Sequence, residues 1–322
     1  MTPQHIKFFK ELSKNDVHIA GGKGASLGEM TRAGIPVPPG FVLTRAAFDR
    51  FLEETDLDVE VEAELRKVNY KDVNSVDKAS NVIRDLIHDE RMPKDLQKEI
   101  LGAYKKLKAK DVAVRSSATA EDSSQASWAG ELETYLNTTE KNLIGNVKKC
   151  WSSLFTPRAI VYRNEKGMRK SKVSVAVVVQ AMVQAEIAGV MFTVHPVTKD
   201  HNQMIIEAVW GLGEVLVGGQ ITPDSYVVDK RDWSLIDVTV APQEKILIQN
   251  PSTSSGQGKG GNAWVRGPKA NVDKQKLSGK EIVAIAKLGK TIEAHYGLPE
   301  DIEWVYLKKK FYIVQSRPIT TL

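Results

Sequence analysis

Apolar positions in the first half of the chain recur every three to four residues, which is the spacing of amphipathic helices. In the range 77–90, for example, Val82, Ile83, Leu86 and Ile87 would share one helix face. Short apolar runs between the helical segments predict strands at 111–117 and 134–138. The helical spacing predicts further helices at 24–33, 45–54, 95–108, 140–153 and 157–166.

The pattern changes near Lys172, where short apolar runs typical of β-strands take over. One more helix is predicted at 279–296, and a hairpin at 300–318. The segment 250–262 is rich in glycine and serine and is expected to form a mobile surface loop. Helices followed mostly by antiparallel-looking strands indicate an α+β fold with more than one lobe. The strands are predicted at 173–183, 188–194, 203–209, 225–230 and 244–248.

Charge and hydropathy narrow the classes of function. The chain carries a formal net charge of +5, and its lysines are dispersed rather than gathered in a stripe. Such an excess suits a protein that handles polyanionic small molecules, and the missing stripe argues against nucleic-acid binding. The N-terminus has no signal-peptide pattern, and no apolar run approaches the roughly 20 residues that span a bilayer. We therefore expect a cytoplasmic protein without a membrane segment.

Length and cysteine content limit the architecture. The 322 residues are too many for one small core and suggest two or three lobes. The single cysteine, Cys150, excludes an intrachain disulfide and any multi-cysteine metal site. We expect it to be a reduced, half-buried thiol on a helix.

The segment "AGGKGASLGEM" places three glycines around Lys23, just before a predicted helix. Glycine lets the backbone approach a phosphate, a helix N-terminus offers unpaired N–H groups, and lysine adds a positive charge. The segment is not a Walker A loop, because Val17 stands where that motif needs its first glycine. The alternative is a tight turn with a solvent-exposed lysine.

The segment "VAVRSSATAED" runs from an apolar strand through Arg115 into a loop of hydroxyl and acidic residues. Hydroxyl and backbone N–H groups donate to phosphate oxygens, and a guanidinium can bind them with two parallel hydrogen bonds. The alternative is an arginine at a strand end that pairs with Glu121 or Asp122. The segment "SWAGELETYLN" follows at once and brings Gly130 and Thr134 close to this loop in sequence.

The segment "VVVQAMVQAEIAGVMFTVHP" has two apolar strands with polar residues between them. A nucleotide base needs a flat apolar slot with a few hydrogen-bonding groups at its edge, which Met182, Val183 and Gln180 could supply. The alternative is a core hairpin without a ligand. His195 precedes a proline and is expected to be structural. In "IIEAVWGLGE", the alternation leaves open whether Glu207 points inward or outward.

The hairpin at the end of the sequence carries polar residues among apolar ones. If 308–310 form a three-residue loop, Glu303 lies opposite Gln315 and Asp301 lies opposite Arg317. Because side chains alternate between faces, these four would share one face. A loop one residue longer or shorter would put the acid and the amide on opposite faces. The residues then expected on the other face are Trp304, Tyr306, Tyr312 and Val314.

This predicted polar face has a possible chemical use. A carboxylate and an amide oxygen on directly opposed positions can hold one hard cation such as Mg²⁺ together with phosphate oxygens. A nearby guanidinium would neutralise charge that develops on a transferred phosphoryl group. The alternative is an ordinary hairpin with a solvated polar face.

Taken together and in this order, "GGKGASLGEM", "RSSATAED", "WAGELETYLN", "GVMFT", "DIEW" and "VQSRP" resemble the N-terminal nucleotide-binding domain of the phosphoenolpyruvate synthase (pyruvate, water dikinase) and pyruvate phosphate dikinase family. The rifamycin phosphotransferases share that domain. The resemblance covers nearly the whole chain. It implies an ATP-grasp fold of two lobes, 1–184 and 185–322, with ATP in the cleft between them and Mg²⁺ as the second cofactor.

The resemblance also implies roles for individual residues. In the N-terminal lobe, phosphate-binding loops and the adenine-side strand would hold the nucleotide. In the C-terminal lobe, the hairpin would hold the metal. Lys23 and Arg115 would bind the ATP phosphates, and Gly130 and Thr134 would lie against the nucleotide. Gln180, Met182 and Val183 match the adenine side, and Glu303 and Gln315 match the metal and phosphate ligands. Arg317 matches the catalytic arginine, assisted by Lys23 and Arg115.

The sequence departs from the family pattern in one loop. The residues after "TAED" are Ser123, Ser124 and Gln125, where relatives often have Leu-Pro. Glu131 stands where relatives have glutamine in the "FAGQ" segment. A carboxylate beside a triphosphate is unfavourable unless it faces metal or solvent. These departures bear on substrate handling and not on the fold.

Family enzymes pass the phosphoryl group to a histidine on a swivelling domain, and a further domain handles pyruvate. Neither domain is recognisable here, and no histidine lies in a phosphohistidine-like setting. We therefore expect an ATP-binding phosphotransferase module of a phosphoenolpyruvate synthase-like enzyme, with the other domains supplied in trans or lying outside this chain. The alternatives are the ATP half of a rifamycin-type antibiotic phosphotransferase and a non-catalytic nucleotide-binding subunit. The histidines considered are His5, His18, His88, His195, His201 and His295.

Overall fold

The chain divides into two compact units, each with its own sheet. The structure is a computed structural model that describes residues 4–118, 133–167, 174–250, 261–320 and 322. The loop predicted at 250–262 and the departures at 123–125 lie wholly or largely outside these residues. Unit 1 comprises Met1–Arg32 and Pro39–Met182, and unit 2 comprises Ala33–Pro38 and Val183–Leu322.

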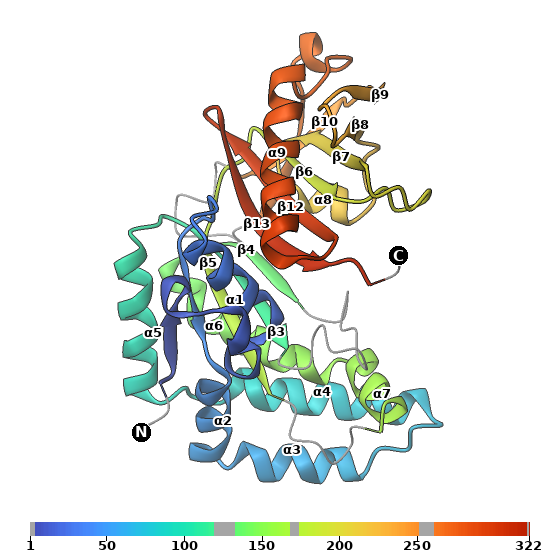
Figure 1. Cartoon of the computed structure of the whole chain (residues 1–322). Helices are drawn as coiled ribbons and strands as arrows, with labels where there is room; N and C mark the ends of the chain where they lie inside the picture. The colour runs from blue at the N-terminus through green and yellow to red at the C-terminus, as the bar shows by residue number, and fades with distance from the viewer. Residues whose placement is uncertain (1–3, 119–132, 168–173, 251–260, 321) are drawn as a thin grey trace. The chain divides into compact units, whose positions relative to one another are not determined.

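Unit 1 contains a five-stranded sheet in which the described pairs are antiparallel (Figure 1). The strand order is β1-β2-β5-β3-β4. Its strands are β1 (Ile6–Phe8), β2 (Gly40–Leu43), β3 (Val112–Ala118), β4 (Thr134–Thr138) and β5 (Val175–Ala181). Its α-helices are α1 (Val17–Arg32), α2 (Arg45–Glu54), α3 (Leu57–Arg66), α4 (Val73–Asp89), α5 (Lys94–Leu107), α6 (Glu140–Ser152) and α7 (Pro157–Glu165), and short 3₁₀ turns cover Phe9–Glu11, Lys14–Asp16 and Ser153–Phe155.

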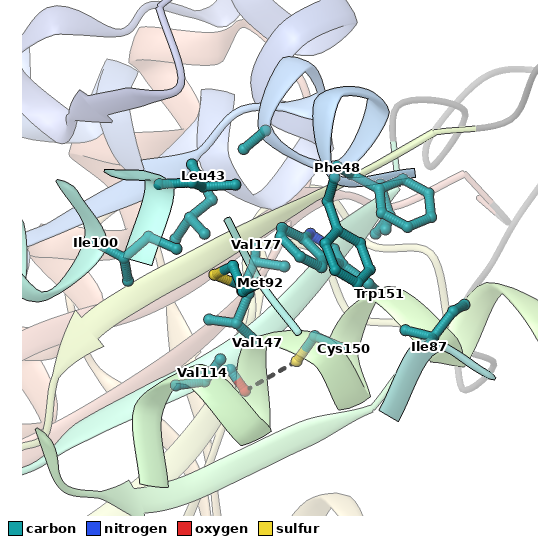
Figure 2. Packing of buried hydrophobic residues seen from close by; sticks show 14 of the residues in the cluster. Leu43, Phe48, Ile87, Met92, Ile100, Val114, Val147, Cys150, Trp151 and Val177 are labelled. Carbon is teal, nitrogen blue, oxygen red and sulfur yellow. Dashed lines mark hydrogen bonds between the residues drawn. The ribbon is translucent and has the colours of Figure 1, made fainter. Parts of the chain in front are cut away.

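One face of this sheet forms the core of unit 1. Valines of β3 and β5 pack there against apolar residues of α2 to α6 (Figure 2). The ring of Trp151 stacks on Phe51 with centroids 5.1 Å apart and lies 5.5 Å from Phe48. Cys150 is fully buried among these residues, and its Sγ lies 3.6 Å from the carbonyl oxygen of Val114. The prediction of a half-buried thiol was therefore wrong, because α6 turns this position directly onto the sheet.

The opposite face of the same sheet carries helix α1. This helix begins at Val17 rather than at the predicted residue 24, and it breaks at Gly21, where φ is 68°. Only glycine adopts this conformation readily, and a Cβ atom at Gly21 would lie 2.2 Å from the Ser117 hydroxyl. That hydroxyl donates to the carbonyl oxygen of Ala20 (2.9 Å) and accepts from the N–H of Gly24 (3.3 Å). Ser117 on β3 therefore fixes the break in α1.

Unit 2 contains a six-stranded sheet of antiparallel pairs in the order β13-β12-β6-β7-β8-β9, and a separate two-stranded sheet β10-β11 (Figure 1). Both units together confirm the α+β prediction. The strands are β6 (Ile187–Phe192), β7 (Gln203–Trp210), β8 (Asp224–Asp229), β9 (Leu235–Thr239), β10 (Lys245–Gln249), β11 (Asn262–Arg266), β12 (Glu300–Leu307) and β13 (Lys310–Pro318), and the helices are α8 (Glu214–Val217), α9 (Gly279–Tyr296) and a 3₁₀ turn at Lys269–Asn271.

Helix α9 covers one face of the six-stranded sheet (Figure 1). Lys230, the residue after β8, holds the helix in place, since its Nζ lies 2.9 Å from a Glu293 carboxylate oxygen and donates to the carbonyl oxygen of Thr193. Within the sheet, Gly189 on β6 makes room for Trp304 on β12. A Cβ atom at Gly189 would lie 2.2 Å from that ring. The other face carries Asp301, Glu303 and Glu207 together with the buried Ala188 and Val209.

Among the described residues, no helix is long and apolar enough to cross a membrane. The predicted helices at 45–54 and 279–296 coincide with α2 and α9. The strand predicted at 173–183 corresponds to β5, which ends earlier than predicted, at Ala181. The elements that the sequence patterns did not predict include β1, α3, α8, β9 and β11.

Candidate functional site

Arg115 lies at the centre of the polar face in unit 1. In the register of the sheet it is directly opposite Thr134 on β4 and Val178 on β5. Directly opposed residues share a sheet face, so Arg115 and Thr134 point to the same side. Arg115 is only 9% exposed. A guanidinium at this position can bind phosphate oxygens with two parallel hydrogen bonds.

Gln180 extends this face along β5. It stands two residues beyond Val178, which places it on the same side as Arg115, and it lies opposite Gly40 and Ala113. Gln180 is 2% exposed. The sheet thus brings a cation, a hydroxyl and an amide, predicted from three separate motifs, onto one face.

Lys23 belongs to the helix that packs on this same face. It lies in the first turn after the break at Gly21 and is half-buried. The break creates a second helix start inside α1, so the amides near Lys23 begin a helical turn. Ser117, which holds the break, stands two residues from Arg115 on the same face of β3. The glycine loop and the arginine strand are therefore joined through one hydroxyl.

Met182 and Val183 follow the end of β5 and do not belong to the strand. The N–H of Met182 donates to the carbonyl oxygen of Asp111 (3.0 Å), and both residues are partly exposed. The chain passes from unit 1 to unit 2 between them. Gly130, the remaining residue expected near a nucleotide, lies outside the described residues.

The hairpin β12–β13 in unit 2 has a shorter turn than predicted. Leu307 pairs with Lys310, which leaves only Lys308 and Lys309 in the loop. Both have positive φ, 49° and 62°, as a two-residue turn of this hand requires. The prediction of a three-residue loop was wrong.

A β-bulge restores the predicted pairing further along. Trp304 pairs with Ile313, but the next residue, Glu303, pairs with Gln315, so Val314 is the extra residue. The bulge compensates for the missing loop residue. The predicted pairs Glu303–Gln315 and Asp301–Arg317 are therefore confirmed, although the claim that loop length alone decides them was wrong.

The bulge also changes which residues share a face near the turn. Tyr312 pairs with Val305 and so lies on the side of Glu303, not with Trp304 and Tyr306 as predicted. The residue that packs opposite Trp304 is Ile313, which is fully buried. Beyond the bulge, the alternation again matches the prediction.

Arg317 forms an ion pair with Asp301 across the hairpin. Its Nε lies 2.9 Å and its Nη2 2.8 Å from the same Asp301 carboxylate oxygen. Burial raises the pKa of Asp301 above its ordinary value, against the opposing effect of Arg317, and the Glu303 carboxylate raises it further. Arg317 keeps 46% of its side chain exposed, so it remains accessible to a ligand.

Glu207 is an acid on the same face whose direction the sequence left open. Glu303 pairs with Val190 on β6, and Val190 pairs with Glu207 on β7, so all three share one side. Burial raises the pKa of Glu207, and the charge of Asp301 adds to this effect. The alternation of exposure along β7 is the signal that places Glu207 away from α9.

The donors of this face suit a hard cation. Glu303 and Gln315 stand directly opposite, and carboxylate and amide oxygens are ligands of the kind Mg²⁺ takes. Within the described part of the chain, no group of three or more His, Cys, Asp or Glu side chains is arranged to hold a metal alone. Mg²⁺ usually binds one or two protein oxygens and completes its shell with phosphates and water.

The two sheet faces differ in charge: the face in unit 1 carries Arg115, and the face in unit 2 carries Asp301, Glu303 and Glu207. The family model described as the pyruvate phosphate dikinase AMP/ATP-binding domain matches residues 17–322. The chain therefore belongs to this family of ATP-binding domains, as the sequence motifs predicted.

The similar proteins carry one name. The chain is 47% identical to the probable phosphoenolpyruvate synthase of Methanocaldococcus jannaschii, with 98% of this chain and 27% of that protein aligned. It is 44% identical to the phosphoenolpyruvate synthase of Pyrococcus furiosus, with 100% of this chain and 44% of that protein aligned. A third relative, the probable phosphoenolpyruvate synthase of Archaeoglobus fulgidus, is 45% identical. The chain thus spans less than half of each of these relatives.

Proposed function

We propose that this chain is the ATP-binding phosphotransferase module of a phosphoenolpyruvate synthase-like enzyme. It would pass a phosphoryl group from Mg·ATP to a histidine on another domain or chain, on the way from pyruvate to phosphoenolpyruvate. The observation that carries this proposal is the register of the hairpin, which sets Glu303 opposite Gln315 and Asp301 opposite Arg317 in a chain of this family. The two lobes of the ATP-grasp fold would be 1–184 and 185–322.

Unit 1 would hold the nucleotide. Arg115 and Lys23 bind phosphate oxygens, Arg115 by a two-pronged contact and Lys23 as a point charge beside helix N–H groups. Gln180 is buried and fixed at the adenine side, where Met182 and Val183 supply apolar surface. Thr134, with Gly130, lies against the nucleotide.

Unit 2 would supply the half of the site that binds the metal and neutralises charge. Glu303 and Gln315 would hold Mg²⁺, which would supply positive charge to neutralise the phosphates. Arg317 exchanges part of its contact with Asp301 for the transferred phosphoryl group, where it stabilises developing charge. Asp301 keeps the guanidinium oriented until then.

The partners of the module would be a phosphohistidine domain and a pyruvate-binding domain. The greater length of the relatives supports this, since this chain aligns with 27% and 44% of two of them. Neither nucleic acid nor a membrane is needed for this reaction.

The test supplies the chain with ATP, Mg²⁺ and the histidine-bearing domain of a relative, and measures phosphohistidine. Glu303→Ala and Arg317→Ala should each lower the rate by about a hundredfold or more, with unchanged thermal unfolding. Lys280→Ala, on the exposed side of α9, is the matched control and should transfer normally. Undiminished transfer in Glu303→Ala would refute the assignment, and Mg·ATP binding without transfer by the wild type would favour a non-catalytic subunit.

A further inference from the structure

Unit 2 contains a cavity of about 590 Å³ that the proposed ATP site does not use. Three stretches line it, at 220–222, 242–245 and 264–266. None of these residues belongs to the face that carries Glu303 and Arg317. The volume lies within the range of roughly 300–1,000 Å³ that small-ligand sites occupy.

The wall at 242–245 is held in place by a buried side chain. Gln243 is 3% exposed; its Oε1 accepts from the N–H of Trp210 (2.9 Å), and its Nε2 donates to the carbonyl oxygens of Trp210 (3.0 Å) and Lys245 (3.1 Å). The N–H of Gly267 closes the next turn by donating to the carbonyl of Glu244 (2.8 Å). A wall fixed in this way is preformed for a ligand.

Two cations face each other in the lining. Lys245 on β10 pairs directly with Arg266 on β11. Like charges at directly opposed positions destabilise a sheet, and among the described residues no ion pair offsets either one. An anion between them would turn this repulsion into two charge-assisted contacts. Glu244 is the acid in the lining, so the two cations leave it with a net positive charge.

An indole ring lies beside this pair of cations. Trp264 stands two residues before Arg266 on β11 and so shares its sheet face. The residue is 44% exposed, whereas its cross-strand partner Leu247 is buried. An exposed indole next to a cation pair offers a flat surface on which a planar ring can stack.

We propose that this cavity binds a mononucleotide, with its base stacked on Trp264 and its phosphate between Lys245 and Arg266. Gln220 and Thr222, which also line the cavity, supply hydrogen-bonding groups for the ribose or the base edge. The site is separate from the proposed ATP site and does not depend on it. It gives the module a place where a nucleotide can act without taking part in the transfer.

The test titrates the chain with AMP in the absence of Mg²⁺ and follows tryptophan fluorescence. We expect quenching that Trp264→Phe removes, which assigns the signal to this ring among the six tryptophans. Lys245→Ala combined with Arg266→Ala should weaken AMP binding by at least about tenfold. Lys280→Ala removes one exposed positive charge elsewhere and should leave the binding unchanged.

Further ligands separate the parts of the proposal. Inorganic phosphate and adenosine should each bind more weakly than AMP, since each makes one of the two contacts. Phosphate or adenosine binding as tightly as AMP would overturn the mononucleotide assignment. The absence of AMP quenching that depends on Trp264 would overturn it too. Glu303→Ala and Arg115→Ala should leave this quenching intact, and Arg266→Ala should leave Mg·ATP binding intact. Each proposal can therefore be refuted without refuting the other.

Discussion

Each of the two sheets of the molecule carries charged residues on one face, and these two faces differ in charge and burial. In unit 1, Arg115 is 9% exposed and Gln180 is 2% exposed beneath helix α1. In unit 2, Asp301, Glu303 and Glu207 form a half-buried acidic face. In the proposed function, the positive charge of unit 1 would bind the triphosphate and the carboxylates of unit 2 would bind its metal.

The apolar sides also differ. The core of unit 1 is a cluster of apolar residues, including the fully buried Trp151. Unit 2 contains a fully buried ion pair, in which Lys276 Nζ lies 2.7 Å from Asp224. Asp224 also accepts from the hydroxyl of Tyr226 and the N–H of Ala241. The core cluster of unit 1 is therefore apolar, whereas unit 2 contains a fully buried ion pair within a polar network.

The largest effect should come from breaking this buried pair. Lys276→Met leaves the Asp224 carboxylate buried without its cation and should cost about 3–5 kcal/mol of unfolding free energy. Asp224→Asn added to Lys276→Met removes that charge, keeps an acceptor, and should recover more than half of the loss. Urea unfolding measures both, with the exposed Lys280→Met as control. Equal stability of Lys276→Met and Lys280→Met would show that the two cores do not differ in this way.

A smaller effect should separate positioning from stability in unit 1. Ser117→Ala removes the hydroxyl that joins Ala20 and Gly24, and should cost about 1–2 kcal/mol and also weaken ATP binding through Lys23. Ser116→Ala is the matched control, since its hydroxyl is also buried but bonds to the carbonyl of Glu133. Thermal unfolding and calorimetry with ATP measure the two effects. An equal loss of ATP affinity in both variants would contradict the role of the helix break.

The smallest effect should be a pH dependence that belongs to unit 1. Burial lowers the pKa of His88 below its ordinary value of 6.5, and the charges of Arg84, Lys149 and Lys148 add to this. The unfolded chain then binds the proton more readily, so stability falls as the pH drops through about 6.5 and levels off below the folded pKa. His88→Gln should flatten this dependence in unfolding measured at pH 7.5 and 5.5, whereas the exposed His201→Gln should not. A dependence that persists in His88→Gln would assign it to other groups.

Periodicity predicted the long, half-buried elements well. Helices α2 and α9 were predicted to the residue, because apolar positions recur along one face of each helix. The missed strands β9 and β11 are short and largely exposed, so burial leaves little trace of them in the sequence. The fold class can be predicted from the pattern of apolar positions, whereas short strands at the edge of a sheet cannot.

The site residues show a different limit. The pairing of Glu303 with Gln315 was predicted correctly from a wrong loop length, because a two-residue turn and the extra Val314 compensate each other. Alternation in sequence cannot reveal such a pair of offsetting irregularities. Nor could it choose between three neighbouring glycines for the break at Gly21, which depends on contact with Ser117.

The division of labour between the two units is tested most directly by calorimetry of ATP binding with and without Mg²⁺, in the wild type, Arg115→Ala and Glu303→Ala. Arg115→Ala should lower ATP affinity by about tenfold or more whether or not Mg²⁺ is present, since it removes a phosphate contact. Glu303→Ala should abolish the strengthening by Mg²⁺ and leave metal-free binding unchanged. If Glu303→Ala binds ATP with the wild-type dependence on Mg²⁺, unit 2 does not supply the metal half of the site.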